Sequence, residues 1–350
     1  MPKNIVFLAD GTWDEPSNNS NVQQLYSALD NIPGVQVTTY DSGVGTDGTP
    51  IDKLLGGAFG AGLFGKIKDG YSAISASYAT GDRISLFGFS RGAFTARSLA
   101  GMIAICGLPT VNQKDSRITD MAFEAYRNAS ERSFLLGELN AAYRMEDARI
   151  QLLGVWDTVG SLGIPAIFGD SDPVLYGFLD TSLHPDVLNA VQALAIDEQR
   201  QQFQPCLWTS PPAHGQSVTQ CWFAGVHCDV GGGYSPDPGG GVLSLITLRW
   251  MGSFAAGCGL RFKAGMEPLM TLPSPPLNAL AKLNDSRTGA YRIFPPHIRS
   301  IDASAMVASS VQARCANAAS KYAPQNLHLV PGPTPGTHQL ASTYQIANVL

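Results

Sequence analysis

Short apolar runs that end in polar or glycine-containing motifs recur along this chain, and they constrain its fold more than any other feature. The runs cover residues 5–9, 35–40, 84–87, 150–156, 191–196 and 221–226. Continuous apolar runs of this length are typical of strands buried on both faces, as in parallel sheets. Between them, apolar side chains recur at helical spacing over residues 21–30, 67–78 and 93–105. The alternation predicts a doubly wound, mostly parallel α/β sheet with helices on both faces.

The carboxyl ends of parallel strands meet at one edge of such a sheet, and ligands bind beyond that edge. Each apolar run ends in a polar motif, so we expect side chains from distant parts of the chain to converge there. We predict one domain over residues 1–350 with loop and helical excursions. Proline-rich interruptions make residues 273–350 a less regular C-terminal part, in which residues 303–322 are expected to form a helix.

The composition excludes several classes of function. A formal net charge of −5 gives no general attraction to phosphate backbones, so we expect no nucleic-acid partner. No stretch approaches the ~18 apolar residues of a membrane span, and the apolar run after Asn4 is too short for a secretory signal. The six cysteines include no C-x-x-C pair and are expected to be reduced thiols. We therefore expect a cytoplasmic protein without a transmembrane segment. The alternative location is outside the cell, after export that does not use a signal peptide.

The sequence G-F-S-R-G over residues 88–92 matches the G-x-S-x-G pattern of a nucleophile elbow. It follows an apolar run and precedes a helix-compatible stretch, which is the strand–turn–helix context that an elbow requires. Gly88 and Gly92 suit a sharp turn in which neighbouring backbones approach closely. The pattern predicts Ser90 as a nucleophile, with the backbone N–H of Arg91 as one oxyanion donor at the positive end of a helix. The alternative is a tight turn with an incidental serine.

A serine nucleophile needs a positioned imidazole that takes its proton. Among the six histidines, His227 is the best candidate. It ends an apolar run, precedes a glycine triplet and fits the chain order of serine, acid and histidine. The acid is expected at Asp157 or Asp197, which both end apolar runs between Ser90 and His227. Asp157 is our choice, and the alternative roles of Asp197 are a helix cap or an ion-pair partner of Arg200.

The second oxyanion donor is expected from the loop after the first apolar run, through the backbone of Gly11 or Thr12. Asp10 in the same loop either binds substrate or braces the loop. Asp229 is a further candidate for substrate contact or support. On a strand, His227 and Asp229 would face the same side and offer two metal ligands, but no further His or Cys cluster supplies a third. We therefore expect no metal and no cofactor.

A glycine-rich stretch resembles a nucleotide-binding loop. Residues 60–65 fit G-x-G-x-x-G, and residues 60–66 fit most of a phosphate-binding loop. Ile67 stands where that loop needs serine or threonine, and no strand precedes the glycines, so we interpret the stretch as a compact connection before a helix. Burial in the core is expected, with an acyl-chain entrance as the alternative, for the apolar side chains of this region: Leu54, Leu55, Phe59, Leu63 and Phe64.

Motifs spread along the chain resemble, in order, those of one protein family. They are D-G-T-W at residues 10–13, G-F-S-R-G-A-F-T-A-R at 88–97, V-W-D-T-V-G at 155–160, A-I-D-E at 195–198 and G-V-H-C-D-V-G-G-G-Y at 225–234. From residue 5 to residue 327 the chain is similar to a bacterial and fungal α/β-hydrolase family whose best-known members are phospholipase effectors of the type VI secretion system. The resemblance implies a triad of Ser90, Asp157 and His227, and hydrolysis of carboxylic esters with phospholipid as a candidate substrate. It also implies an immunity or secretion protein as a candidate partner.

The secreted phospholipases of that family are longer than this chain and carry membrane-facing modules, so the resemblance favours an esterase over a toxin. We predict a serine hydrolase of the α/β-hydrolase type that cleaves carboxylic esters, lipid or phospholipid esters among them. The predicted reaction passes through an acyl-Ser90 intermediate and needs no cofactor. The alternative is a non-catalytic α/β module that binds a protein partner.

Overall fold

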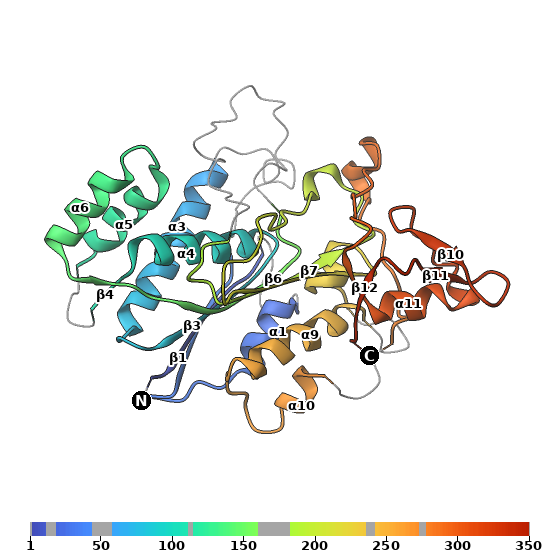
Figure 1. Cartoon of the computed structure of the whole chain (residues 1–350), viewed down its shortest axis with the longest axis horizontal. Coiled ribbons are helices and arrows are strands. Elements are labelled where there is room, and N and C mark those ends of the chain that lie inside the picture. The colour runs from blue at the N-terminus through green and yellow to red at the C-terminus, as the bar shows by residue number, and fades with distance from the viewer. Residues whose placement is uncertain are drawn as a thin grey trace.

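A parallel sheet of eight strands forms the centre of the protein (Figure 1). The computed structural model describes residues 2–11, 19–43, 58–110, 115–159, 183–235, 242–272 and 278–349. Within these residues the strands of the sheet are β1 (Asn4–Ala9), β2 (Gln36–Asp41), β3 (Arg83–Phe89), β6 (Ile150–Trp156), β7 (Asn189–Ala195), β8 (Ser217–Phe223), β9 (Met306–Ala308) and β12 (Gln345–Ala347). Their order is β12-β9-β8-β7-β6-β3-β1-β2, and neighbouring strands pair in parallel.

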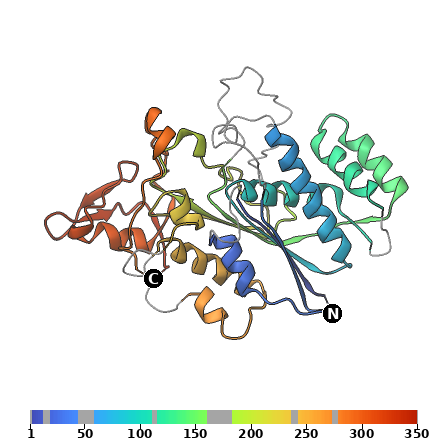
Figure 2. The ribbon, with the colours of Figure 1, turned by 180° about the vertical axis from the view of Figure 1, so that it is seen from behind.

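Helices cover both faces of the sheet, as the two opposite views show (Figure 1, Figure 2). One face carries α3 (Ala58–Ser77), α4 (Arg91–Cys106), α5 (Arg117–Arg127) and α6 (Arg132–Ala142). The other carries α1 (Asn21–Ala28), α8 (His227–Gly231), α9 (Ser244–Gly257) and α11 (Ser309–Cys315). Along β1, Phe7 packs into the first apolar layer and Leu8 into the second. Burial on both faces explains the continuous apolar runs and confirms the predicted doubly wound α/β fold.

Smaller elements complete the described part of the chain. Two short antiparallel pairs join β4 (Leu108–Pro109) to β5 (Met145–Glu146) and β10 (Leu329–Pro331) to β11 (His338–Leu340). The remaining helical segments are α10 (Glu267–Met270) and the 3₁₀ turns η4 (Gln201–Phe203), η5 (Gly289–Ile293) and η6 (Ala318–Ser320). Among the described residues, no helix combines the length and apolar character needed to cross a membrane.

The direction in which the chain crosses the sheet reverses between β1 and β3. β2 lies on one side of β1, whereas β3 lies on the other side, and the later strands continue outward from β3. A reversal of this kind separates the connections that leave two neighbouring strands and opens a crevice at their carboxyl ends. The loops that begin at Asp10 and Ser90 leave β1 and β3 at this point.

The C-terminal part differs from the sequence prediction in one element. The predicted helix over residues 303–322 is wrong in its extent, because α11 covers only Ser309–Cys315. Met306–Ala308 instead pairs in parallel with β8 and β12, so these residues are drawn into the sheet. β9 and β12 thus carry the sheet into the part predicted to be less regular, while the single domain over residues 1–350 stays a prediction.

The glycine-rich stretch is helical rather than a connection before a helix. Because α3 begins at Ala58, residues 60–65 lie inside this helix, which also excludes the backbone of a phosphate-binding loop there. Leu63 is buried in the core, and the ring of Phe64 lies 5.3 Å from that of Phe123. The predicted burial in the core is confirmed for Leu63, whereas Phe64 is only partly buried against the core. Leu54, Leu55 and the side chain of Phe59 lie outside the described part of the chain.

Candidate active site

Ser90 occupies the turn between β3 and α4. Its backbone has a φ of 58° and a ψ of −119°, a positive-φ conformation that residues other than glycine rarely adopt. Ser90 N donates a hydrogen bond to Trp156 O at 3.1 Å, which fixes the turn to the end of β6. The predicted strand–turn–helix context is therefore observed, and a strained serine at the end of a central strand is typical of a nucleophile elbow.

The glycines on either side of Ser90 let three backbone segments meet. A Cβ atom at Gly92 would lie 2.1 Å from Ala9 O, and one at Gly88 would lie 2.3 Å from Gly92 O. Both distances are far inside van der Waals contact, so a larger residue fits only if backbone moves. The first turn of α4 therefore packs directly on the end of β1, at the point where the strand order reverses between β1 and β3.

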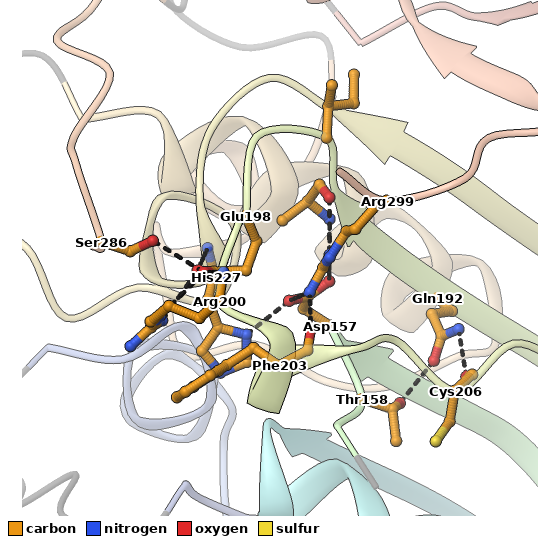
Figure 3. A network of polar contacts seen from close by, with 12 residues as sticks. Asp157, Thr158, Gln192, Glu198, Arg200, Phe203, Cys206, His227, Ser286 and Arg299 are labelled. Atoms are coloured by element: carbon orange, nitrogen blue, oxygen red, sulfur yellow. Dashed lines mark hydrogen bonds and ion pairs between the residues drawn. The ribbon is translucent and has the colours of Figure 1, made fainter. Parts of the chain in front are cut away.

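His227 and Asp157 form a buried pair at the same edge of the sheet. His227 Nδ1 and Asp157 Oδ2 are 2.6 Å apart (Figure 3). Their side chains are 3% and 0% exposed. Asp157 directly follows β6 and has a positive φ of 39°, and His227 is the first residue of α8. Of the two acids that the sequence left open, Asp157 is the one that contacts the imidazole.

The imidazole of His227 lies between two aromatic rings, with centroid distances of 4.6 Å to Phe89 and 5.0 Å to Phe203. Burial lowers the pKa of His227, although the hydrogen bond to Asp157 opposes this shift. Because Asp157 accepts the proton of Nδ1, the neutral ring has its lone pair on Nε2. Nε2 is buried and has no hydrogen-bond partner among the described residues. The structure therefore places Phe89 against the imidazole but does not form the hydrogen bond between Ser90 and His227.

Glu198 fixes the backbone beside the imidazole, a role that the sequence pattern did not reveal. Its carboxylate accepts hydrogen bonds from His227 N at 3.2 Å and from Ser286 Oγ at 2.9 Å (Figure 3). Arg200 donates to both carboxylate oxygens at 2.9 Å. Burial alone raises the pKa of Glu198, but the hydrogen bonds and charge of Arg200, together with the charge of His227, outweigh it and lower this pKa to about 2. Glu198 is therefore ionised and anchors the start of α8.

Asp197, the alternative acid, is engaged elsewhere. It accepts hydrogen bonds from Gly225 N at 2.6 Å and from Tyr322 Oη at 2.8 Å. Burial raises its pKa to about 6. The ion pair with Arg200 expected as one of its roles is wrong, because Arg200 pairs with Glu198. Asp197 thus supports the loop that leads into α8.

Asp229 supports the same helix. Its Oδ2 accepts from Val226 N at 3.1 Å, and its Oδ1 accepts from Asn284 Nδ2 at 2.6 Å. The expectation that His227 and Asp229 share one side of a strand is wrong, because both belong to α8. Within the described ranges, no group of three or more His, Cys, Asp or Glu side chains is arranged to hold a metal ion.

Asp10 braces the loop after β1, which is the second of the two roles predicted for it. Its buried carboxylate accepts hydrogen bonds from Tyr40 Oη at 2.7 Å, from Gly11 N at 2.8 Å and from Ser20 Oγ. Burial raises the pKa of Asp10, and these three donors oppose the shift. The carboxylate thereby ties the loop to β2 and to the start of α1.

The three backbone N–H groups predicted as oxyanion donors are those of Gly11, Thr12 and Arg91, and they differ in the contacts around them. The N–H of Gly11 is engaged by Asp10, so this structure does not direct it at a substrate oxygen. Thr12 lies outside the described residues. Arg91 is the first residue of α4 and lies at the positive end of this helix. This position favours Arg91 N among these candidates for an oxyanion donor.

Arg299 is a second buried charged residue that the sequence pattern missed. It is 1% exposed and donates to both carboxylate oxygens of Asp157, at 2.7 and 2.9 Å (Figure 3). It lies in an irregular segment between η5 and β9, 142 residues after Asp157. No local pattern connects two residues so far apart, and the polar, proline-containing sequence around Arg299 gives no sign of burial.

Residues 3–253 match a family model described as the catalytic domain of Tle1-like phospholipase effectors of the type VI secretion system. The uncharacterized protein YEL023C of Saccharomyces cerevisiae is 30% identical in an alignment that is 188 residues long and covers 46% of this chain and 27% of that protein. An uncharacterized protein from Pseudomonas aeruginosa has a solved structure with a TM-score of 0.46 and 17% identity, covering 78% of this chain and 48% of that one. The structure of the Tle1 effector bound to the VgrG spike matches with a TM-score of 0.40 and 20% identity, covering 68% of this chain and 52% of that one.

This chain spans 27% of the curated relative and 48% and 52% of the two solved chains, so each of them is much longer. The matched residues 3–253 include all three members of the predicted triad, whereas Arg299 lies beyond them. Because the family model covers most of the chain, the protein belongs to the Tle1-like phospholipase effector family.

Proposed function

We propose that this protein is a serine hydrolase that cleaves carboxylic esters, with phospholipid as a candidate substrate, through an acyl-enzyme on Ser90. The observation that carries the proposal is the buried hydrogen bond between His227 and Asp157 at the edge of the sheet where Ser90 adopts a strained turn. A nucleophile, a base and an orienting acid at the ends of neighbouring elements are what acyl transfer requires. The family model supports the choice of a lipid ester.

In the proposed reaction, Ser90 Oγ attacks the ester carbonyl carbon while His227 Nε2 takes the serine proton. Asp157 keeps the imidazole in the tautomer with its lone pair on Nε2 and stabilises the imidazolium that forms. Arg91 N donates to the oxyanion of the tetrahedral intermediate. His227 then protonates the leaving alcohol, and a water molecule repeats the sequence to release the acid.

Substrate binding has to bring Ser90 Oγ and His227 Nε2 together, since that hydrogen bond is not formed here. Hydrogen bonds between catalytic groups are often long in substrate-free structures and shorten in the Michaelis complex. The strained backbone of Ser90 is already in place, so the proposal requires movement of side chains rather than a new turn.

Labelling with a fluorophosphonate probe tests the nucleophile. We expect the wild-type protein to form a covalent adduct, and Ser90→Ala to abolish it, because the probe reacts with a serine activated by a base. Ser98→Ala is the matched control, since Ser98 lies buried in the same helix α4 and should leave labelling unchanged. A wild-type protein that neither labels nor cleaves short p-nitrophenyl esters would overturn the proposal and support the non-catalytic binding module.

The pH dependence of kcat/KM tests the base. His227 must be neutral to accept a proton, and burial lowers its pKa. Activity is therefore expected to rise with pH through a midpoint below the ordinary histidine value of about 6.5 and to stay level above it. The measurement is kcat/KM for a neutral ester from about pH 4 to about pH 9. A midpoint above about 7, or an activity controlled by added metal, would contradict this assignment.

A further inference from the structure

The catalytic acid proposed here is shared between the base and a buried arginine. Arg299 Nη1 lies 2.7 Å from Asp157 Oδ1, and Arg299 Nη2 lies 2.9 Å from Asp157 Oδ2 (Figure 3). Both side chains are 0% exposed. The guanidinium also donates to two backbone oxygens, Ala195 O at 2.7 Å and Phe203 O at 2.5 Å. These contacts connect Asp157 to the end of β7 and to η4.

Four hydrogen bonds restrict the carboxylate of Asp157 to one orientation. Oδ1 accepts from Ala195 N at 3.0 Å and from Arg299 Nη1, and Oδ2 accepts from His227 Nδ1 and from Arg299 Nη2. A planar guanidinium fork matches a carboxylate in two parallel hydrogen bonds, which fixes the plane as well as the position of the acid. Oδ2 is therefore held where it meets the imidazole.

Stability alone gives a weak reason for this arrangement. Taking an arginine and a carboxylate fully out of water costs several kcal/mol per ion, and apolar pairs of similar volume are often at least as stable. The Nε atom of Arg299 also has no hydrogen-bond partner among the described residues. The guanidinium is oriented so that both Nη atoms donate to Asp157, although this leaves Nε without an acceptor in the described part of the chain. This orientation indicates that Arg299 has a role in the active site.

Arg299 also changes the charge that the imidazole meets. Burial alone raises the pKa of Asp157, but the charge and hydrogen bonds of Arg299 together with those of His227 outweigh it and hold this pKa well below its usual range. The same positive charge partly neutralises the carboxylate on which an imidazolium at His227 depends. Glu198 and Arg200, which form an ion pair with each other, also influence the pKa of His227.

We propose that Arg299 is a positioning residue of this active site: it orients the Asp157 carboxylate toward His227 and weakens the negative charge that this carboxylate presents to the imidazole. The inference rests on the proposed function, because it assigns Arg299 to the same triad. It also extends the site beyond the family match, since residues 3–253 do not include Arg299.

Two substitutions separate orientation from charge. Arg299→Met removes both, so we expect kcat to fall by about 10- to 100-fold, as for other groups that orient a catalytic ligand. The acid limb of kcat/KM should move up by about one pH unit, because the unshared Asp157 charge makes His227 more basic. Arg299→Lys keeps the charge but lacks the fork, so the acid limb should return toward its wild-type position while kcat stays low. KM should change little in both variants.

Arg292→Met is the matched control. Arg292 lies in η5, shortly before Arg299 in the chain, but its side chain is 69% exposed and lies 3.7 Å from Asp285. Its replacement should leave kcat and the pH profile at wild-type values. Wild-type kcat and an unmoved acid limb in Arg299→Met would overturn the proposal. If Arg299→Met does not fold, Arg299→Lys decides, because an unchanged kcat in that variant would exclude an orienting role for the fork.

An NMR titration of the His227 imidazole separates failure of this proposal from failure of the proposed function. It reads the ring directly and needs no activity. An upward shift of about one pH unit in Arg299→Met supports the coupling between Arg299, Asp157 and His227, even if the wild-type protein does not label with fluorophosphonate. An unshifted titration in a folded, labelling-competent variant would refute the charge effect while leaving the serine hydrolase intact.

Discussion

Replacement of His227 by alanine is expected to lower kcat/KM for an ester substrate by about 10⁴-fold or more. The variant loses the only imidazole that contacts Asp157 among the described residues, so no side chain remains to take the proton of Ser90. The loss should fall on kcat rather than KM, because the proton transfer occurs in the transition state and not in the bound ground state. Steady-state kinetics with a short p-nitrophenyl ester measures it.

The fold should tolerate the loss of His227. Asp157 keeps its two hydrogen bonds to Arg299 and one from Ala195 N, so its charge stays compensated. His184→Ala is the matched control, since the His184 ring lies 3.5 Å from Asp186 in a partly exposed loop and should leave the rate within about twofold. A folded His227→Ala variant that retains more than about a tenth of the wild-type rate would rule out His227 as the base.

Gly92→Ala is expected to lower the free energy of unfolding by about 3 kcal/mol. Its Cβ would lie 2.1 Å from Ala9 O, a backbone atom at the end of β1 that cannot swing aside as a side chain could. Either α4 must retreat from β1 or the end of β1 must move, and both changes displace the turn that holds Ser90. Urea unfolding followed by circular dichroism measures the stability, and fluorophosphonate labelling should fall with it.

Gly137→Ala supplies the comparison for Gly92→Ala. Gly137 lies inside α6, and a Cβ there would meet nothing within 4 Å. Alanine should raise stability by about 0.5–1 kcal/mol at this site, because it restricts the unfolded chain and suits a helix. An unchanged unfolding midpoint in Gly92→Ala would show that α4 and β1 do not pack as closely as described.

The parts of the site that depend on local sequence could be predicted. The turn around Ser90 is encoded by adjacent residues, because an apolar strand, two glycines and a helix follow one another without a gap. Asp157 and His227 could also be found, since each follows an apolar run and the chain order of the triad restricts the choice. The sequence left open whether Asp157 or Asp197 is the acid of the site. In the structure Asp157 contacts the imidazole of His227, whereas Asp197 accepts from Gly225 N.

The parts that depend on contacts between distant residues could not be predicted. Arg299 and Glu198 act on Asp157 and His227 through pairing geometry that no spacing in the chain encodes. The prediction for the glycine-rich residues 60–65 was wrong, because they are helical rather than a connection. Burial of α3 against the sheet outweighs the low helix propensity of glycine. Residues 306–308 were predicted as helix, but pairing with β8 made them a strand.

The distance in sequence between Asp157 and Arg299 has a consequence for the timing of biosynthesis. The ion pair joins residues that are 142 positions apart, and a ribosome adds roughly 5–20 residues per second. Roughly 7–28 s therefore pass between the synthesis of the acid and the synthesis of its arginine. During that interval the nascent chain carries Asp157 without the arginine that donates to both of its carboxylate oxygens. The orientation of this acid can therefore be completed only after residue 299 has been added.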